Sequence, residues 1–198
     1  MDVSSQALSS IKIRVVLIGG MKVGKTSMAY RFVEEKFDPD QVATIGVDYL
    51  WKILKIGSTE VEYEIWDTAG QEKYRCVAVS YIRGSQAIVA VYDLSDPDTV
   101  QEMIDMVNSV TDKLGHDIPL YVVGNKSDLS CNVPEGIADF CSLNDAMSFV
   151  TSAKTGEGIR ELFYTIGKNE KSRKAAETKV ESRTVDIKKK ADGKDCAC

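Results

Sequence analysis

Short apolar runs recur along most of this chain and mark its predicted strands. Four of these runs are continuous and rich in β-branched residues, the pattern of strands covered on both faces. They lie at residues 11–19, 86–94, 118–125 and 148–153. Residues 47–56 and 61–66 flank Gly57 and Ser58, which predicts two antiparallel strands joined by a tight connection.

The segments between these strands carry a helical pattern. Residues 26–35 and 159–168 are predicted helices, and residues 96–114 begin with Asp-Pro and then repeat apolar residues at helical spacing. Residues 129–147 are the least regular part, with one short helix expected near Pro134. The alternation predicts an α/β fold with a mostly parallel six-stranded sheet, one antiparallel edge pair and flanking helices. Ligands of such folds bind at the carboxyl ends of the strands.

Size and charge narrow the function classes. The chain has 198 residues, 43% of them hydrophobic, which is enough for one core. The net charge of −5 argues against a nucleic-acid binder. From Lys168 to Asp195, ten Lys or Arg stand against six Asp or Glu. We therefore expect a flexible N-terminus at 1–10, a single folded domain at 11–168 and a flexible, basic tail at 169–198.

No targeting or membrane-spanning segment is expected. The start, MDVSSQALSS, lacks the basic residues and apolar core of a signal peptide, and no apolar stretch approaches about eighteen residues. Five cysteines, an odd number, indicate the reducing cytosol. Cys76, Cys131, Cys141 and His116 show no metal-ligand spacing, so we expect them to be structural or exposed.

The first candidate site is a phosphate-binding loop. Gly19-x4-Gly24-Lys25-Thr26 fits the P-loop pattern between a predicted strand and a predicted helix. The glycines let backbone N–H groups turn toward phosphate oxygens, and the helix N-terminus reinforces them. Lys25 would reach the terminal phosphates, and Thr26 would offer its hydroxyl to Mg²⁺. The cofactor-binding residues expected here are Met21, Lys22, Val23, Gly24, Lys25, Thr26 and Ser27.

A second motif selects the base. NKSD follows a predicted strand, and the carboxylate of Asp128 can accept the adjacent N–H donors of guanine, whereas adenine has no matching donors. Asn125 would tie this segment to the phosphate loop, and the stem of Lys126 would cover the ring. Alone the motif is a weak signal, because Asn and Asp are common in turns. A backbone N–H from SAK could complete the base site, whose expected residues are Asn125, Lys126, Asp128, Ser152, Ala153 and Lys154.

Five motifs together resemble those of one family. They are GGMKVGKT (19–26), TIGVDY (44–49), WDTAGQE (66–72), NKSD (125–128) and SAK (152–154). In this order they resemble a small GTPase of the Ras superfamily, and the Trp before DTAGQE, TIGVDY and the terminal Cys-Ala-Cys are similar to the Rab family. GQEKY is similar to the early-endosomal Rab subgroup. The resemblance covers about residues 11–168 plus the last three, and implies a P-loop NTPase, small-GTPase fold.

The resemblance implies a GTP/GDP switch with Mg²⁺ that hydrolyses GTP slowly and recruits effectors to membranes in vesicular trafficking. Gln71 would orient the attacking water, and Gly70 would meet the γ-phosphate with its N–H. Phe37 matches an aromatic that packs against guanine, with a core aromatic as the alternative. The Mg²⁺ ligands implied are Thr26, Thr44 and Asp67, the last through a water. Segments around Thr44 and Gln71 would change with the nucleotide.

Two further features have open alternatives. Met21 stands where the family usually has glycine or serine, so a thioether there could crowd an inserted arginine finger, or it could point outward without effect. Three aromatics match an effector patch, with half-buried structural residues as the alternative. They are Tyr49, Trp66 and Tyr81.

The chain ends DCAC, which is not a four-residue prenylation box. Resemblance to Rabs implies two geranylgeranyl groups, on Cys196 and Cys198, with Lys188 to Lys190 adding attraction to an anionic leaflet. Free thiols or weak metal binding are the alternatives. The family further implies an exchange factor, a GTPase-activating protein, effectors, a prenylation escort protein and a GDP-dissociation inhibitor. We expect a monomer that cycles between cytosol and the cytoplasmic face of an intracellular membrane, such as an endosome-like compartment.

Two rival functions remain at this point. One is a P-loop kinase or ATPase, against which NKSD and the lack of a visible second substrate site argue. The other is a GTP-loaded binding module that scarcely hydrolyses GTP, against which Gln71 argues.

The segment after NKSD departs from the family, being slightly shorter and lacking its acidic, alanine-containing helix pattern.

Overall fold

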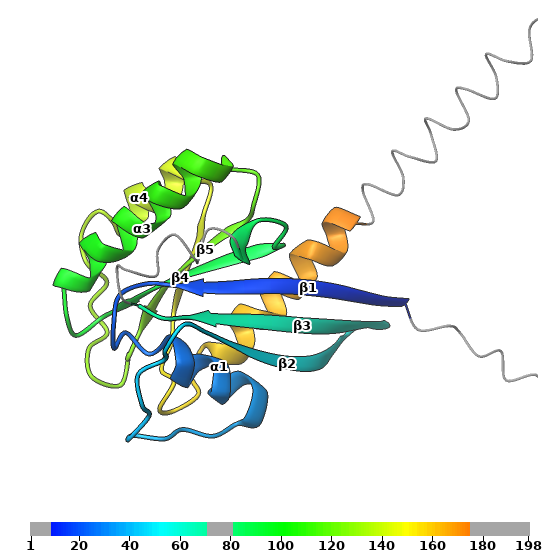
Figure 1. Ribbon diagram of the computed structural model, residues 1–198, viewed down its shortest axis with the longest axis horizontal. Coiled ribbons are helices and arrows are strands. Elements are labelled where there is room, and N and C mark those ends of the chain that lie inside the picture. Colours follow the sequence, from blue (N-terminus) through cyan, green and yellow to red (C-terminus); the bar gives the residue numbers. More distant parts are fainter. Residues whose placement is uncertain (1–8, 71–80, 175–198) are drawn as a thin grey trace, which may run out of the picture.

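The sheet is the centre of the structure. The computed structural model describes residues 9–70 and 81–174, and within them six strands form one sheet in the order β2-β3-β1-β4-β5-β6. Their bounds are β1 Ser9–Ile18, β2 Val47–Ile56, β3 Thr59–Thr68, β4 Ala87–Asp93, β5 Leu120–Asn125 and β6 Met147–Val150. Only β2 and β3 pair antiparallel among these strands. The predicted mostly parallel sheet with one antiparallel edge pair is confirmed (Figure 1).

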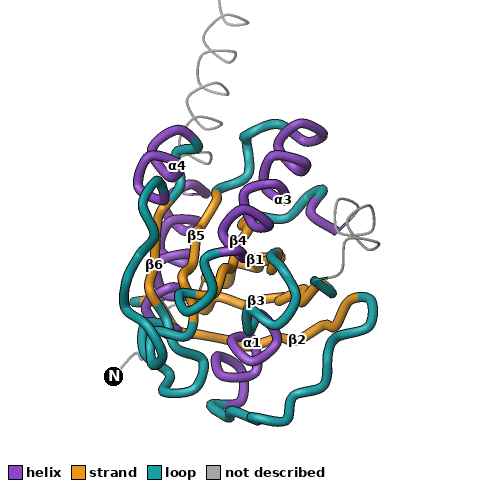
Figure 2. Tube along the Cα trace, turned by 90° about the vertical axis from the view of Figure 1, so that its left-hand side faces the viewer, coloured by secondary structure: helices purple, strands orange, loops and turns teal. Residues whose placement is uncertain are grey.

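Continuous apolar sequence places the central strands between two layers of helices. Every residue of β4 and of β5 is buried, as expected for parallel strands covered on both faces. The helices are α1 (Lys25–Glu34), α3 (Asp98–Leu114), α4 (Ile137–Leu143) and a C-terminal helix described over 159–174. Figure 2 shows the sheet between α1 on one side and α3 and α4 on the other.

Two apolar clusters hold these layers together. Under α1 and the C-terminal helix, Phe32 stacks on Phe163 with ring centroids 3.8 Å apart, and the edge of Tyr63 meets both rings. On the opposite face, Met103 and Val107 of α3 pack with Ile137 of α4 against alternate residues of the strands. The two clusters fix both faces of the sheet and so position the loops at its carboxyl edge.

Several predicted bounds were wrong. Strand β1 begins at Ser9, inside the expected flexible N-terminus at 1–10. The C-terminal helix continues to residue 174, past the expected end at Lys168, because Glu170 is buried and accepts hydrogen bonds from Arg173 while Asn169 donates to the Tyr121 hydroxyl. The last strand ends at Val150 rather than at residue 153. There the chain turns, with Gly156 N–H donating to the carbonyl of Ser152.

Candidate functional site

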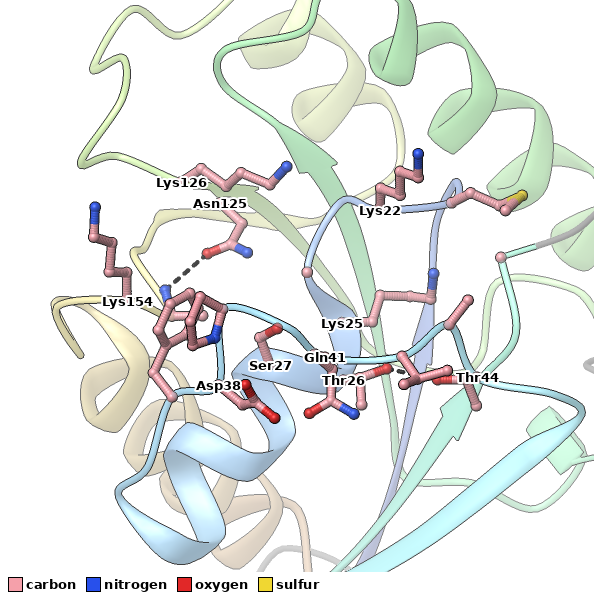
Figure 3. Close-up of a pocket in the computed structure, with 18 of the residues that line it drawn as sticks. Lys22, Lys25, Thr26, Ser27, Asp38, Gln41, Thr44, Asn125, Lys126 and Lys154 are labelled. Atoms are coloured by element: carbon pink, nitrogen blue, oxygen red, sulfur yellow. Dashed lines mark hydrogen bonds between the residues drawn. The ribbon is translucent and has the colours of Figure 1, made fainter.

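A cavity of about 580 Å³ opens at the carboxyl edge of the sheet. It is lined by the loop after β1, the start of α1, the loop from Phe37 to Thr44 and the loops after β5 and β6. Figure 3 shows Lys25, Thr26 and Thr44 at one end and Asn125, Lys126 and Lys154 at the other. This is the edge where parallel α/β sheets bind ligands.

Most of the predicted site residues meet in this cavity. Those lining it are Met21, Lys22, Gly24, Lys25, Thr26, Ser27, Phe37, Thr44, Gly70, Asn125, Lys126, Asp128, Ala153 and Lys154. Val23, Asp67 and Ser152 are buried beside it. Gln71, Cys196 and Cys198 lie outside the described residues. Sequence reasoning missed seven lining residues, Asp38, Pro39, Gln41, Val42, Ala43, Thr68 and Leu129. The first five lie between Phe37 and Thr44, and that position was the one signal that could have found them.

The phosphate loop is organised around Lys25. Its Nζ donates to the carbonyl oxygens of Gly19 at 2.9 Å and Gly20 at 2.7 Å. Burial lowers the pKa of Lys25 to about 8, with the charges of Asp67 and Glu102 opposing the shift. Helix α1 begins at Lys25 without a side-chain cap, so its first N–H groups face the cavity as anion donors.

Hard oxygen ligands converge beside the phosphate loop. Thr26 Oγ1 donates to Asp67 Oδ2 at 2.5 Å, and Thr44 Oγ1 lies 2.7 Å from Thr26 Oγ1 and 3.1 Å from the same carboxylate oxygen. The other oxygen, Asp67 Oδ1, is buried and has no hydrogen-bond partner among the residues that the structure describes. Burial raises the pKa of Asp67, although hydrogen bonds from Thr26 and the charge of Lys25 oppose the shift.

This donor set fits Mg²⁺. Among the residues described here, no group of three or more His, Cys, Asp or Glu could hold a metal ion. The oxygen ligands available beside the phosphate loop are the Asp67 carboxylate and the hydroxyls of Thr26 and Thr44. Mg²⁺ is typically bound by one or two carboxylates, with substrate phosphates and water completing its shell. The unpaired Asp67 oxygen is a ready acceptor for one of those waters.

The base end of the cavity is joined to the phosphate loop. Asn125 Nδ2 donates to the Val23 carbonyl at 2.9 Å. Asn125 Oδ1 accepts the Ala153 N–H at 3.1 Å, the dashed line from Asn125 in Figure 3. A Cβ at Gly24 would overlap the Asn125 amide, so the glycine permits this close approach. Asp128 accepts from Ser152 Oγ at 2.6 Å.

Asp93, at the end of β4, holds Lys126. Asp93 Oδ2 lies 2.6 Å from Lys126 Nζ, and Asp93 Oδ1 accepts from the Ser95 hydroxyl and N–H. Burial would raise the pKa of Asp93, but the hydrogen bonds from Lys126 and Ser95 hold it below its ordinary value. Its position at the end of a predicted strand was the signal that could have found it.

The three predicted patch aromatics form one cluster outside the cavity. The Tyr49 ring meets Trp66 edge-on at 5.5 Å, Trp66 lies 4.8 Å from Tyr81, and Arg14 covers the Trp66 ring. Tyr49 is 44% exposed. Phe37 lines the cavity and also packs against the first apolar cluster. Met21 lines the cavity with 43% of its surface exposed.

Two expectations about other residues can be compared with the structure. Cys131 is exposed and Cys141 is buried, both as free thiols, while Cys76 lies outside the described residues. No helix in residues 9–70 or 81–174 has the length and apolar character to cross a membrane.

The residues that line the cavity are of the types expected for a guanine-nucleotide pocket, and the chain is similar in sequence to known GTP-binding proteins. The sequence profile of the Ras family matches residues 14–172. The chain is 36% identical over 176 residues to GTP-binding protein YPT53 of Saccharomyces cerevisiae, covering 84% of this chain and 80% of the relative. It is 36% identical over 160 residues to Ras-related protein SEC4 of the same yeast, covering 79% and 74%.

A third relative spans nearly the whole chain. Ras-related protein Rab-4 of Dictyostelium discoideum is 30% identical over 204 residues, covering 94% of this chain and 97% of the relative. Proteins of this family bind and hydrolyse GTP, so the kinase or ATPase alternative and the non-hydrolysing module are wrong. The chain therefore belongs to the Ras family and, within it, to the Rab-family small GTPases, which are GTP-binding switches.

Proposed function

We propose that this GTPase is a membrane-trafficking switch, whose loop around Thr44 is held in the GTP state and released after hydrolysis. The observation that carries this proposal is the contact of Thr44 with Thr26 and Asp67. Thr44 lies in the loop between α1 and β2, whereas Thr26 and Asp67 belong to α1 and β3. A nucleotide-dependent ion between them would therefore control the loop.

Residue roles follow from the geometry of the phosphate end. Lys25 binds the terminal phosphates, and Thr26, Thr44 and Asp67 hold Mg²⁺, which neutralises charge that develops on the phosphates. Gly70 donates its N–H to the γ-phosphate, which is supported by its close approach to the phosphate loop, where a Cβ would lie 2.7 Å from Met21 N. Gln71, the next residue, orients the attacking water.

At the base end, Asp128 accepts the paired N–H donors of guanine and the segment Ser152 to Lys154 supplies a backbone N–H. Lys126 and Phe37 cover the two sides of the ring. The hydrogen bonds of Asn125 to both neighbouring loops support this assignment, because they keep phosphate and base subsites at a constant separation.

Effectors bind the aromatic cluster of Tyr49, Trp66 and Tyr81. Aromatic side chains are favoured anchors of interfaces, and Tyr49 is exposed next to the loop that ends at Thr44. A partner seated there would contact residues whose position depends on the nucleotide.

The tail anchors the protein. Cys196 and Cys198 each carry a geranylgeranyl group, attached with an escort protein, because two lipid chains anchor stably where one does not. A GDP-dissociation inhibitor extracts the protein from the membrane, while an exchange factor and a GTPase-activating protein switch its nucleotide state. Together they complete the cycle between cytosol and the cytoplasmic face of an endosome-like compartment. The relatives named Rab, YPT and SEC4 support this assignment.

The test compares the tagged full chain with a Cys196→Ser/Cys198→Ser double variant in cells. We expect the unaltered chain to sediment with membranes, label an endosome-like organelle and carry two lipids by intact mass. The double variant should be cytosolic and bind GDP normally, and Cys131→Ser should behave like the unaltered chain. An unlipidated chain, or equal solubility of all three proteins, would reject the membrane role.

A further inference from the structure

Helix α1 carries a side chain that reaches the base-binding segment. Arg31 Nε donates to the Ala153 carbonyl at 2.8 Å, and Arg31 Nη2 donates to the Lys154 carbonyl at 2.7 Å. A third hydrogen bond runs from Arg31 Nη1 to the Glu35 carbonyl at 2.6 Å. No motif in the sequence singles out this arginine.

All three acceptors are backbone carbonyl oxygens, so the guanidinium holds chain positions rather than neutralising a carboxylate. Its planar array of donors can serve three acceptors at once in one orientation. A lysine at this position would bring a single ammonium group on a flexible stem, which has no comparable geometry. Arg31 is half-buried, and its hydrogen bond to the Ala153 carbonyl is partly shielded from water, whereas those to Lys154 and Glu35 are exposed.

The segment that Arg31 contacts is held from its other side by β5 and the loop after it. Asn125 Oδ1 accepts the Ala153 N–H at 3.1 Å, and Asp128 accepts the Ser152 hydroxyl at 2.6 Å. The following turn packs on the arginine stem, since a Cβ at Gly156 would lie 3.6 Å from its Cδ. Residues 152–154 are therefore clamped between β5 and α1.

The third contact extends the clamp to the opposite wall of the cavity. Glu35 ends α1 with a left-handed backbone, φ 61°, and its N–H donates to the Arg31 carbonyl at 3.1 Å. Two residues later the chain reaches Phe37, which lines the cavity. One guanidinium thus holds both the base-reading segment and the start of the loop that carries the aromatic.

We propose that Arg31 is a positioning residue for base recognition, which sets the backbone of residues 152–154 against the edge of guanine. The proposal rests on the assignment of base recognition to this segment in the proposed function. The Ser152 N–H donates to the Glu157 carbonyl and the Ala153 N–H donates to Asn125 Oδ1. The Lys154 N–H is therefore the donor that this proposal gives to the O6 acceptor of guanine. Loss of Arg31 lets the segment move and weakens this contact selectively, while the contact of Asp128 with the N–H donors persists.

The experiment measures dissociation of GDP and of 6-thio-GDP from the Mg²⁺-loaded full chain. The thio analogue keeps both N–H donors that Asp128 accepts and replaces O6 with a weakly accepting sulfur. The variants are Arg31→Met and Arg31→Lys, with Arg160→Lys, an exposed arginine of the C-terminal helix, as the matched control. Thermal unfolding of each GDP-bound protein checks that it is folded.

We expect the unaltered protein to release 6-thio-GDP faster than GDP. In Arg31→Met and Arg31→Lys, GDP release should accelerate roughly tenfold, since hydrogen bonds from charged donors contribute on that order. Release of 6-thio-GDP should change little, so the ratio of the two rates falls toward one. Arg160→Lys should match the unaltered protein in both rates.

Equal acceleration of both nucleotides would show that Arg31 supports the fold rather than the base contact and would overturn the proposal. Unchanged GDP release in both Arg31 variants would overturn it too. If instead the unaltered protein released both nucleotides at one rate, or held ADP as tightly as GDP, the assignment of base recognition to residues 152–154 would fail first. A failed fold in Arg31→Met leaves Arg31→Lys to decide between these outcomes.

Discussion

At the residue scale, we propose that the carboxylate of Asp128 carries the discrimination between purines. It stands at the cavity surface with 14% of its side chain exposed, oriented by the hydroxyl of Ser152. The second oxygen, Oδ2, lies 3.6 Å from Lys154 Nζ, and the remaining lone pairs of the carboxylate can accept hydrogen bonds from a ligand. A single side chain can therefore decide specificity without any change in the phosphate loop.

The variant Asp128→Ala should lose most of its guanine preference. We expect GDP affinity to fall by a factor of about 10² or more, because a site built on buried hydrogen bonds discriminates strongly by them. Equilibrium titration with a ribose-labelled GDP, in competition with ADP, measures both affinity and preference. Asp117→Ala, at an exposed carboxylate before β5, should leave both unchanged. Preserved discrimination in Asp128→Ala would contradict the role.

The variant Met21→Ser tests the unusual residue of the phosphate loop. Met21 lines the cavity and is 43% exposed, and we expect its side chain there to crowd the approach of an arginine finger. We expect single-turnover GTP hydrolysis with an activating protein to rise by about two- to tenfold, a small part of the gain an arginine finger supplies. Intrinsic hydrolysis should stay slow in both proteins. Equal stimulated rates would remove this explanation.

At the scale of elements, α1 and the C-terminal helix depend on one aromatic contact. Phe163 is fully buried and stacks on Phe32 of α1. Phe163→Ala should lower the free energy of unfolding by about 3–5 kcal/mol, the usual cost of a large core cavity. Urea denaturation measures it. Tyr164→Ala, at the 45% exposed neighbour, should cost under about 1 kcal/mol, and equal losses would contradict the packing argument.

The ends of β4 and β5 are joined by Asp93 and Lys126, which makes stability depend on pH. Asp93 has a lowered pKa, so its contribution is complete above about pH 4, where the unfolded carboxyl is ionised. It is lost as the pH falls through the lowered native pKa. Asp93→Asn should cost about 1–3 kcal/mol at pH 7.

Urea denaturation at several pH values between about 2.5 and about 7 checks the sign of this effect. The difference between Asp93→Asn and the unaltered protein should shrink toward the acid end, because the unaltered carboxyl then becomes neutral as well. Asp117→Asn should show little difference at any pH. A difference for Asp93→Asn that is constant across the range would exclude the ion pair as its cause.

At the scale of the whole molecule, the proposed function links the nucleotide, the metal ion and the loop around Thr44. Removal of Mg²⁺ by a chelator should speed GDP release by a factor of about ten or more and lower the melting temperature, since a ligand that binds the native state stabilises it. Thr26→Ala should show a much smaller response, because a hydroxyl beside Asp67 is then missing. An unaltered protein that is indifferent to chelation would contradict the metal assignment.

Much of this architecture could be predicted from the chain itself. Strands β4 and β5 are apolar without interruption, and the Gly-Lys-Thr and Asn-Lys-Ser-Asp spacings are local signatures of phosphate and guanine binding. The continuation of the C-terminal helix from residue 169 through residue 174 could not be predicted. Residues 169–174 have no continuous apolar pattern and are held by the contacts of Asn169 and Glu170 with distant or neighbouring side chains.

The sequence by itself determined the fold class, the phosphate loop, the choice of base and the family, because each depends on residue types at short, regular spacings. Only the tertiary structure decided which distant side chains orient these motifs. Arg31 reaches Ala153 and Lys154 across more than 120 positions of sequence, and Asp93 meets Lys126 between adjacent strands. Such contacts arise from folding in three dimensions, and no local pattern in the chain records them.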